Sequence, residues 1–256
     1  MQSQKNYKRI VIKVSSGSLF WKNDIDEDVL GDLVRQVVSL SEKGHEVIIV
    51  SSGAIALGMH ILKMKNRPKE LSCLQAVAAI GQHHLMGQYQ SHFKKKDKNC
   101  AQILLTYDDF INRKRYLNAK NTILTLWQLK SIPVVNENDT ISADEIKIGD
   151  NDKLSSLVAT MVEADLLIML SDVDGLLDGE GKVVRIVNEI DHRIKSLVYP
   201  AKKQTSVGGM ITKLEAAKIA IAAGIPCVIA NGCKNNIISS VVEDPENNGT
   251  LFVPKK

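Results

Sequence analysis

Short apolar runs alternate with amphipathic segments along most of this chain. Residues 9–14 are β-branched and apolar, which is typical of a buried strand. A helix is expected over residues 26–43, because apolar residues recur there at steps of three and four and Gly44 is placed to end it. The same reasoning predicts further strands at 46–50, 101–105, 132–135, 166–170, 227–230 and 251–253, and further helices after Gly53 and at 70–96, 112–130, 153–163 and 209–223.

This alternation predicts an α/β fold. Short apolar strands that alternate with amphipathic helices indicate a mainly parallel sheet with helices on both faces. Ligands of such sheets bind beyond the carboxyl ends of the strands. Polar residues at those ends are therefore the first candidates for a functional site.

Two stretches are predicted with less regular structure. The helix over 70–96 contains Gly81 and Gly87, and we expect a break near one of them. Residues 178–208 contain several glycines and a proline and show no periodic pattern, which favours a mobile flap.

Two clusters of amides and carboxylates lie close together in the middle of the chain. The first, Asn-Glu-Asn-Asp at 136–139, directly follows an expected strand, and the second, Gly-Asp-Asn-Asp at 149–152, opens an expected helix. Asparagine both donates and accepts hydrogen bonds, whereas aspartate only accepts, so together they suit the ammonium of an amino acid. Each cluster alone also fits ordinary turn and capping chemistry.

Small residues follow two of the expected strands. Lys13 ends the first strand and precedes Ser-Ser-Gly at 15–17, where backbone N–H groups can approach an anion, although a lysine at a strand end is also commonly solvated. Residues 51–58 place two glycines at the spacing of a P-loop, but Met59 and His60 stand where Lys and Ser or Thr are required. That turn fits a serine cap and an anion cradle equally well.

Lys213 stands in the first turn of the last long helix, after the glycine pair at 208–209. A cation there is unfavourable for the helix dipole, and a bound polyphosphate would reverse the penalty. The position therefore hints at phosphate binding, while the simpler interpretation is a loop hinge with a surface lysine.

Composition excludes several classes of protein. The chain has 256 residues, is 44% hydrophobic and 24% charged, and carries a formal net charge of +4, which is ordinary for a globular protein. The basic runs at 94–96 and 113–115 lack interleaved aromatic residues, so no nucleic-acid partner is expected. The four cysteines show no C-x-x-C spacing, which predicts no metal site and fits the cytoplasm. No signal peptide or membrane-spanning run is recognisable.

Taken in order, eight segments resemble the amino acid kinase family, and closely its branch that phosphorylates glutamate. They cover nearly the whole chain and lie at 11–13, 51–58, 78–82, 115–119, 133–139, 145–152, 171–176 and 208–213. The resemblance implies a three-layer α/β/α sandwich formed by a single domain over 1–256, in which about residues 1–150 bind the amino acid and about 151–256 bind ATP.

The implied reaction is transfer of the γ-phosphoryl group of ATP to the side-chain carboxylate of L-glutamate, giving L-glutamyl 5-phosphate, the first step of proline biosynthesis. Mg²⁺ is expected to arrive with ATP, held by phosphate oxygens and water. Proline is expected as a feedback inhibitor, and a homodimer or homotetramer as the assembly. Relatives often carry a C-terminal PUA domain, which we do not expect in a chain that stops at Lys256.

The resemblance also assigns roles to individual residues. We expect Lys13 and Lys213 to hold the phosphates from two sides, and Asp152 to orient both lysines. The expected glutamate-binding residues are Ser52, Gly53, Asn136, Asp139, Asp150 and Asn151. The expected nucleotide-binding residues are Lys13, Ser171, Asp172, Val207, Gly208, Gly209, Met210, Ile211, Thr212 and Lys213.

Three positions depart from the usual family pattern. Ser15 stands where glycine is usual, Ser206-Val207 replace Gly-Thr, and Leu177 replaces a common tyrosine. None of these changes removes a charged group, so we expect activity to survive. The alternatives are a related kinase for another acceptor, such as aspartate or UMP, and a sensor that binds ligands without turnover.

Overall fold

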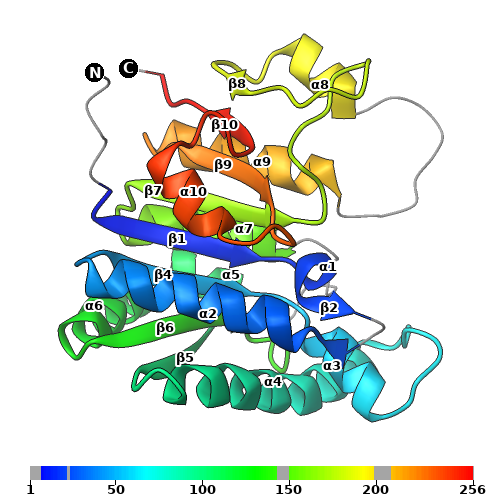
Figure 1. The fold of residues 1–256 in the computed structure, drawn as a ribbon. Helices are drawn as coiled ribbons and strands as arrows, with labels where there is room; N and C mark the ends of the chain where they lie inside the picture. Colours follow the sequence, from blue (N-terminus) through cyan, green and yellow to red (C-terminus); the bar gives the residue numbers. More distant parts are fainter. Residues whose placement is uncertain (1–6, 22–23, 143–149, 199–208, 256) are drawn as a thin grey trace.

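A central sheet of eight strands forms the middle layer of the protein (Figure 1). The structure is a computed structural model that describes residues 7–21, 24–142, 150–198 and 209–255. The strands are β1 (Arg9–Val14), β4 (Glu46–Ser51), β5 (Asn99–Leu105), β6 (Ser131–Glu137), β7 (Leu166–Ser171), β8 (Ile186–Val187), β9 (Cys227–Asn231) and β10 (Thr250–Phe252). Their order across the sheet is β5-β6-β4-β1-β7-β9-β10-β8.

Six of these strands are parallel, from β5 at one edge to β9. β10 runs antiparallel to β9, and β8 pairs with β10 in parallel. The mainly parallel sheet predicted from the alternating pattern is therefore confirmed. Since β1 lies between β4 and β7, the two halves of the sequence meet at the centre of the sheet.

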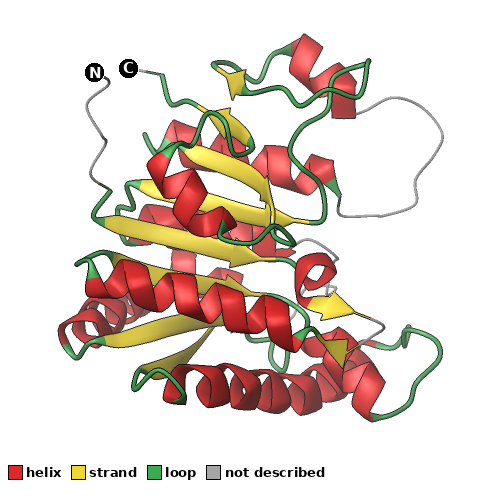
Figure 2. Ribbon diagram, in the orientation of Figure 1, coloured by secondary structure: helices red, strands yellow, loops and turns green. Residues whose placement is uncertain are grey.

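Helices cover both faces of the sheet, as Figure 2 shows. One core packs the sheet against α2 (Glu27–Glu42), α4 (Leu71–Lys94) and α10 (Ile237–Glu243), and the other packs it against α6 (Arg113–Gln128), α7 (Asp150–Met161) and α9 (Met210–Ala222). The remaining elements are α1 (Ser16–Leu19), α3 (Ala54–Ile61), α5 (Tyr107–Ile111), α8 (His192–Val198) and a small pair of strands, β2 (Phe20–Trp21) and β3 (Asp24–Ile25). The α/β/α sandwich is confirmed.

Successive side chains of β1 point to opposite faces of the sheet, and this alternation determines the face to which Lys13 points. Ile12 and Val14 belong to the core beneath α2, whereas Val11 belongs to the core beneath α7 and α9. Because side chains of a strand alternate between its two faces, Lys13 points with Val11 toward α7 and α9. Its side chain is 4% exposed.

The break predicted in the long helix is wrong. α4 runs without interruption from Leu71 to Lys94. Gly81 instead serves close packing, because a Cβ there would lie 1.7 Å from the backbone oxygen of Ala54 in α3. Gly87 has nothing within 4 Å of the place of its missing Cβ.

The irregular stretch at 178–208 contains two elements that the pattern did not predict, β8 and α8. Residues 199–208 lie outside the described part, so the flap stays a prediction. α1, α5, α10 and the β2–β3 pair were also not predicted; each has seven residues or fewer. Within the described part of the chain, no helix combines the length and apolar character needed to cross a membrane.

Candidate active site

Asp152 lies between two lysines that come from opposite halves of the chain. Its Oδ1 is 2.7 Å from Nζ of Lys13 at the end of β1, and its Oδ2 is 3.2 Å from Nζ of Lys213 in the first turn of α9. All three side chains are at most 8% exposed. The contact expected between Asp152 and both lysines is thus present.

Thr212 adds a neutral donor to the same carboxylate. Its hydroxyl donates to Asp152 Oδ2 at 2.6 Å and also lies 3.0 Å from the backbone oxygen of Gly209. Gly209 is the N-cap of α9. The first turn of α9 is therefore tied to the first turn of α7 through one carboxylate.

Burial and mutual contact shift the pKa values of this cluster. For Lys13, burial is the largest influence and Lys213 adds to it, so the pKa of Lys13 is lowered although Asp152 acts to raise it. Burial alone would raise the pKa of Asp152, but the two lysines and the hydroxyl of Thr212 outweigh it and lower that pKa. The carboxylate therefore stays ionised near neutral pH.

A second network begins at Asn151, the residue beside Asp152. Its Nδ2 lies 2.8 Å from the backbone oxygen of Ser51, 3.0 Å from Oγ of Ser52 and 2.9 Å from Oδ1 of Asn136. Asn151 is thereby held against the carboxyl ends of β4 and β6. α7 thus presents one residue to the amide network and the next to the lysines.

The other expected glutamate-binding residues lie around this network. Gly53, with φ of 107°, forms the N-cap of α3 immediately after Ser52. Asp139 is partly exposed in the turn that follows β6. Asp150 begins α7, but its side chain and the preceding residues 143–149 lie outside the described part. The structure therefore joins Ser52, Asn136 and Asn151 by direct hydrogen bonds.

The expected nucleotide-binding residues occupy two neighbouring places. Ser171 ends β7 and donates to Asp172 Oδ1 at 3.1 Å, and the Asp172 carboxylate lies 3.6 Å from where a Cβ of Gly17 would be. Met210 and Ile211 form the start of α9 beside Thr212. Val207 and Gly208 fall outside the described residues. Asp172 thus borders the small-residue turn after Lys13.

Ser15, one of the departures noted above, closes that turn. Its Oγ lies 2.8 Å from Oγ of Ser18 and accepts from the backbone N–H of Ser18 at 3.2 Å. Ser18 is buried. The serine thus caps α1 in the manner of an N-cap side chain.

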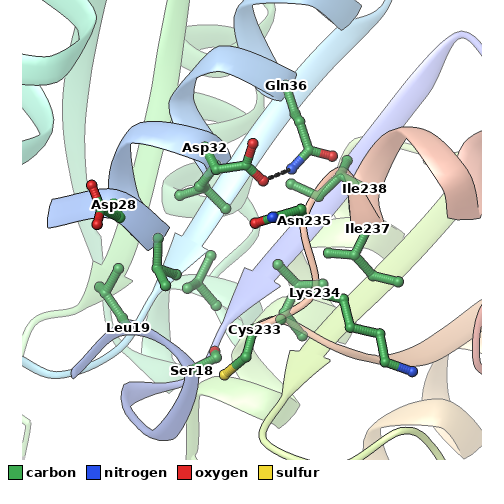
Figure 3. Close-up of a pocket in the computed structure, with 15 residues that line it drawn as sticks. Ser18, Leu19, Asp28, Asp32, Gln36, Cys233, Lys234, Asn235, Ile237 and Ile238 are labelled. Carbon is green, nitrogen blue, oxygen red and sulfur yellow. Dashed lines mark hydrogen bonds between the residues drawn. The ribbon is translucent and has the colours of Figure 1, made fainter. Parts of the chain in front are cut away.

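A small pocket lies on the other face of the sheet (Figure 3). It has a volume of about 70 Å³ and is lined by side chains from α2 and α10, including Asp28, Asp32 and Gln36. The Asp32 carboxylate already accepts hydrogen bonds from the side-chain amide of Gln36 at 2.7 Å and from the backbone N–H of Asn236 at 3.1 Å. Small-molecule sites usually span roughly 300–1,000 Å³, so this pocket is not the site for a nucleotide.

Gln82 was missed as a site residue, and one contact of Thr212 was not expected. Gln82 accepts from Asn136 Nδ2 at 2.7 Å, and Thr212 was expected only as a nucleotide contact, not as a donor to Asp152. The segment 78–82 was part of the family resemblance, which was the one available signal for Gln82. Its role depends on α4 lying near β6, which periodicity does not reveal.

Comparisons with known proteins agree with this architecture. The model of the amino acid kinase family matches residues 8–231. The glutamate 5-kinase of Caldanaerobacter subterraneus is 45% identical over 255 residues, which covers 97% of this chain and 68% of that protein. The glutamate 5-kinase of Carboxydothermus hydrogenoformans is 45% identical over 260 residues, covering 98% of this chain and 69% of the relative.

Solved structures share the fold at low sequence identity. N-acetylglutamate synthase from Neisseria gonorrhoeae, complexed with coenzyme A and N-acetyl-glutamate, gives a TM-score of 0.72 at 11% identity, and the match covers 97% of this chain and 60% of that one. UMP kinase from Ureaplasma parvum gives 0.63 at 18% identity, covering 97% of this chain and all of that one. Since the family model spans most of the sequence and the kinases match nearly all of it, the chain belongs to the amino acid kinase family.

Proposed function

We propose that this protein catalyses ATP-dependent phosphorylation of the side-chain carboxylate of L-glutamate, giving L-glutamyl 5-phosphate for proline biosynthesis. The observation that carries the proposal is the buried contact of Asp152 with Lys13 and Lys213. The relatives that are 42–45% identical over nearly the whole chain are glutamate 5-kinases, which supports the same reaction.

The lysines supply positive charge where phosphoryl transfer requires it. With all three groups ionised, Lys13, Asp152 and Lys213 carry a net charge of +1, so the cluster attracts an anion. Phosphoryl transfer depends mainly on positioning and on neutralising charge at the transferred group. We infer that the two ammonium groups bind phosphate oxygens from two sides while Asp152 keeps them in place.

We propose that the amide network binds the acceptor. Both N–H groups of Asn151 are directed at Ser51, Ser52 and Asn136, so the planar amide turns its oxygen away from them. That oxygen can accept a hydrogen bond from the ammonium of glutamate. Ser52, Gly53, Asp139 and Asp150 complete our proposed acceptor site, and Ser171, Asp172 and residues 207–213 the nucleotide site.

The reaction needs no general base. The side-chain carboxylate of glutamate has a reference pKa of about 4.3 and is already ionised at neutral pH. One of its oxygens attacks the γ-phosphorus, the bond from that phosphorus to the bridging oxygen breaks, and ADP leaves with the electron pair. Lys13 and Lys213 offset the charge that develops on the phosphate oxygens.

Mg²⁺ is proposed to reach the site with ATP. Among the described residues, no group of three or more His, Cys, Asp or Glu side chains could hold a metal. We expect the ion to be held chiefly by phosphate oxygens and water, the usual arrangement for Mg²⁺ with nucleotides. The ion would supply further neutralisation of phosphate charge.

The proposal is tested by trapping the acyl phosphate with hydroxylamine in the presence of ATP, Mg²⁺ and a single acceptor. Hydroxamate formation is expected with L-glutamate and not with L-aspartate, and ADP release is not expected with UMP. Proline, which offers the same amino-acid groups without a side-chain carboxylate, is expected to compete with glutamate. Absence of glutamate-dependent hydroxamate would overturn the proposed function.

A further inference from the structure

Gln82 links helix α4 to the amide network beneath the proposed acceptor site. It follows Gly81, the residue at which the backbone of α3 approaches α4 too closely for a side chain. This approach brings Gln82 near the carboxyl end of β6, where its Oε1 accepts from Asn136 Nδ2 at 2.7 Å. A weaker contact joins Gln82 Nε2 to Oε1 of Gln102 in β5, at 3.5 Å.

Backbone groups fix the direction of every hydrogen bond in this network. The N–H of Glu137 lies 2.9 Å from the side chain of Asn136 and can only donate, so the atom that it meets is Oδ1. The carbonyl of Ser51 can only accept, so it meets Nδ2 of Asn151. Asn136 must therefore present Nδ2 to Gln82, and Gln82 must present its oxygen.

Asn136 depends on Gln82 because its surroundings hold little water. Asn136 is 2% exposed, so removing the acceptor leaves a buried N–H without a partner. Such a group is costly, and the side chain is expected to rotate to relieve it. Rotation would withdraw Oδ1, which is one of the three acceptors that hold Nδ2 of Asn151 in place.

We propose that Gln82 is a positioning residue for the acceptor amino acid, acting through Asn136 on Asn151. This inference rests on the proposed function, since the amino acid is the group that Asn151 would bind. The nucleotide cluster is anchored separately, by Asp152 on Lys13 and Lys213. Loss of the Gln82 acceptor is therefore expected to affect glutamate and to spare ATP.

The test uses three variants of the full chain and separate KM values for glutamate and ATP. Gln82→Met keeps the length of the side chain and removes the amide acceptor, while Gln82→Glu keeps an acceptor oxygen. Gln90→Met, on the exposed side of the same helix, controls for the change of residue type. Thermal melting without ligands, and with glutamate or ADP alone, reports folding and binding apart from turnover.

Gln82→Met is expected to raise KM for glutamate about tenfold, to change KM for ATP less than twofold, and to reduce the glutamate-induced rise in Tm but not the ADP-induced rise. The KM for glutamate of Gln82→Glu is expected to stay within about threefold of the wild-type value, and that of Gln90→Met to match the wild-type value.

An unchanged KM for glutamate in Gln82→Met, or equal changes in KM for both substrates, would overturn the role of Gln82 and leave the proposed function standing. If Gln82→Met does not fold, Gln82→Leu takes its place under the same criteria. Failure of the wild type to use glutamate would overturn the proposed function as well.

Discussion

Asp152 and Lys13 form a buried ion pair, with 2.7 Å between Oδ1 and Nζ, that joins the start of α7 to the end of β1. The other oxygen of the carboxylate contacts Lys213. One aspartate thus balances part of the charge of two lysines and sets the distance between them. Positions this constrained suit a reaction whose catalysis depends on holding phosphate oxygens in place.

Asp152→Asn is expected to lose both activity and stability. The amide cannot balance two buried cations, and breaking a buried ion pair by removing one partner costs about 3–5 kcal/mol of unfolding free energy. Misplaced lysines should lower kcat by about 10²–10³-fold. Urea unfolding and the hydroxamate assay measure the two effects. Glu243→Gln, an exposed carboxylate in α10, is the matched control, and near-normal kcat in Asp152→Asn would contradict the role proposed for Asp152.

Lys213→Met is expected to separate the two effects. It leaves Asp152 paired with Lys13, so no buried charge is uncompensated and the unfolding free energy should fall by less than about 1 kcal/mol. Activity should nevertheless drop about 10²–10³-fold, because one of the two cations proposed to neutralise the transferred phosphoryl group is gone. The comparison requires kcat and urea unfolding of the same preparation. A large loss of stability with normal kcat would show that Lys213 supports the fold and does not act in phosphoryl transfer.

The sequence predicted the parts of this site that strand ends reveal. Lys13, Ser52, Asn136 and Ser171 directly end or follow apolar runs, and parallel strands bring their carboxyl ends to one edge of the sheet. The link of Asp152 to both lysines was expected from the family resemblance and from charge. The residues at the strand ends need only local pattern and the direction of the strands, whereas the role of Asp152 also needs the resemblance.

Other features depend on contacts between segments remote in sequence. A break was predicted near Gly81 or Gly87 because glycine is locally unfavourable in a helix, whereas Gly81 admits the backbone of α3. Gln82 shows no charge or spacing that marks it, and only the packing of α4 near β6 gives it a partner. Short elements such as α5 and β8 are too brief to show a period.

Acid is expected to weaken the fold through Asp152. The pKa of Asp152 is lower in the folded protein than the usual 3.8. Between the folded pKa and the unfolded pKa, the unfolded chain therefore binds more protons than the folded one, and the free energy of unfolding falls as pH falls. The contribution is complete above about pH 5 and is lost as pH drops through the folded pKa. Urea midpoints from pH 6 to pH 3 should therefore fall more steeply in the wild type than in Asp152→Asn. Parallel curves would show that another group governs the acid transition.

Ser15→Ala is expected to loosen the turn after Lys13. The substitution removes the side chain that accepts from the N–H of Ser18, and loss of such a cap costs about 0.5–2 kcal/mol. If the turn binds phosphate through its backbone, KM for ATP should rise severalfold while KM for glutamate stays constant. Ser18→Ala removes the contact between the two hydroxyls but keeps the backbone N–H that donates to Ser15, so its effect should be smaller and not additive with that of Ser15→Ala. Additive effects of the two substitutions would show that the pair does not act as a unit.

Gly81→Ala and Gly87→Ala in α4 are expected to have opposite effects. A methyl group at 81 would lie 1.7 Å from the oxygen of Ala54, which is backbone and cannot rotate away, so α3 must move and Tm should drop by several degrees. At 87 nothing lies within 4 Å, and alanine should stabilise the helix by about 0.5–1 kcal/mol. α3 begins directly after Gly53, which belongs to the proposed acceptor site. A shift of α3 in Gly81→Ala should therefore also raise KM for glutamate, whereas Gly87→Ala should leave it unchanged. Equal melting temperatures for the two variants would mean that the close approach of α3 and α4 does not determine the choice of glycine.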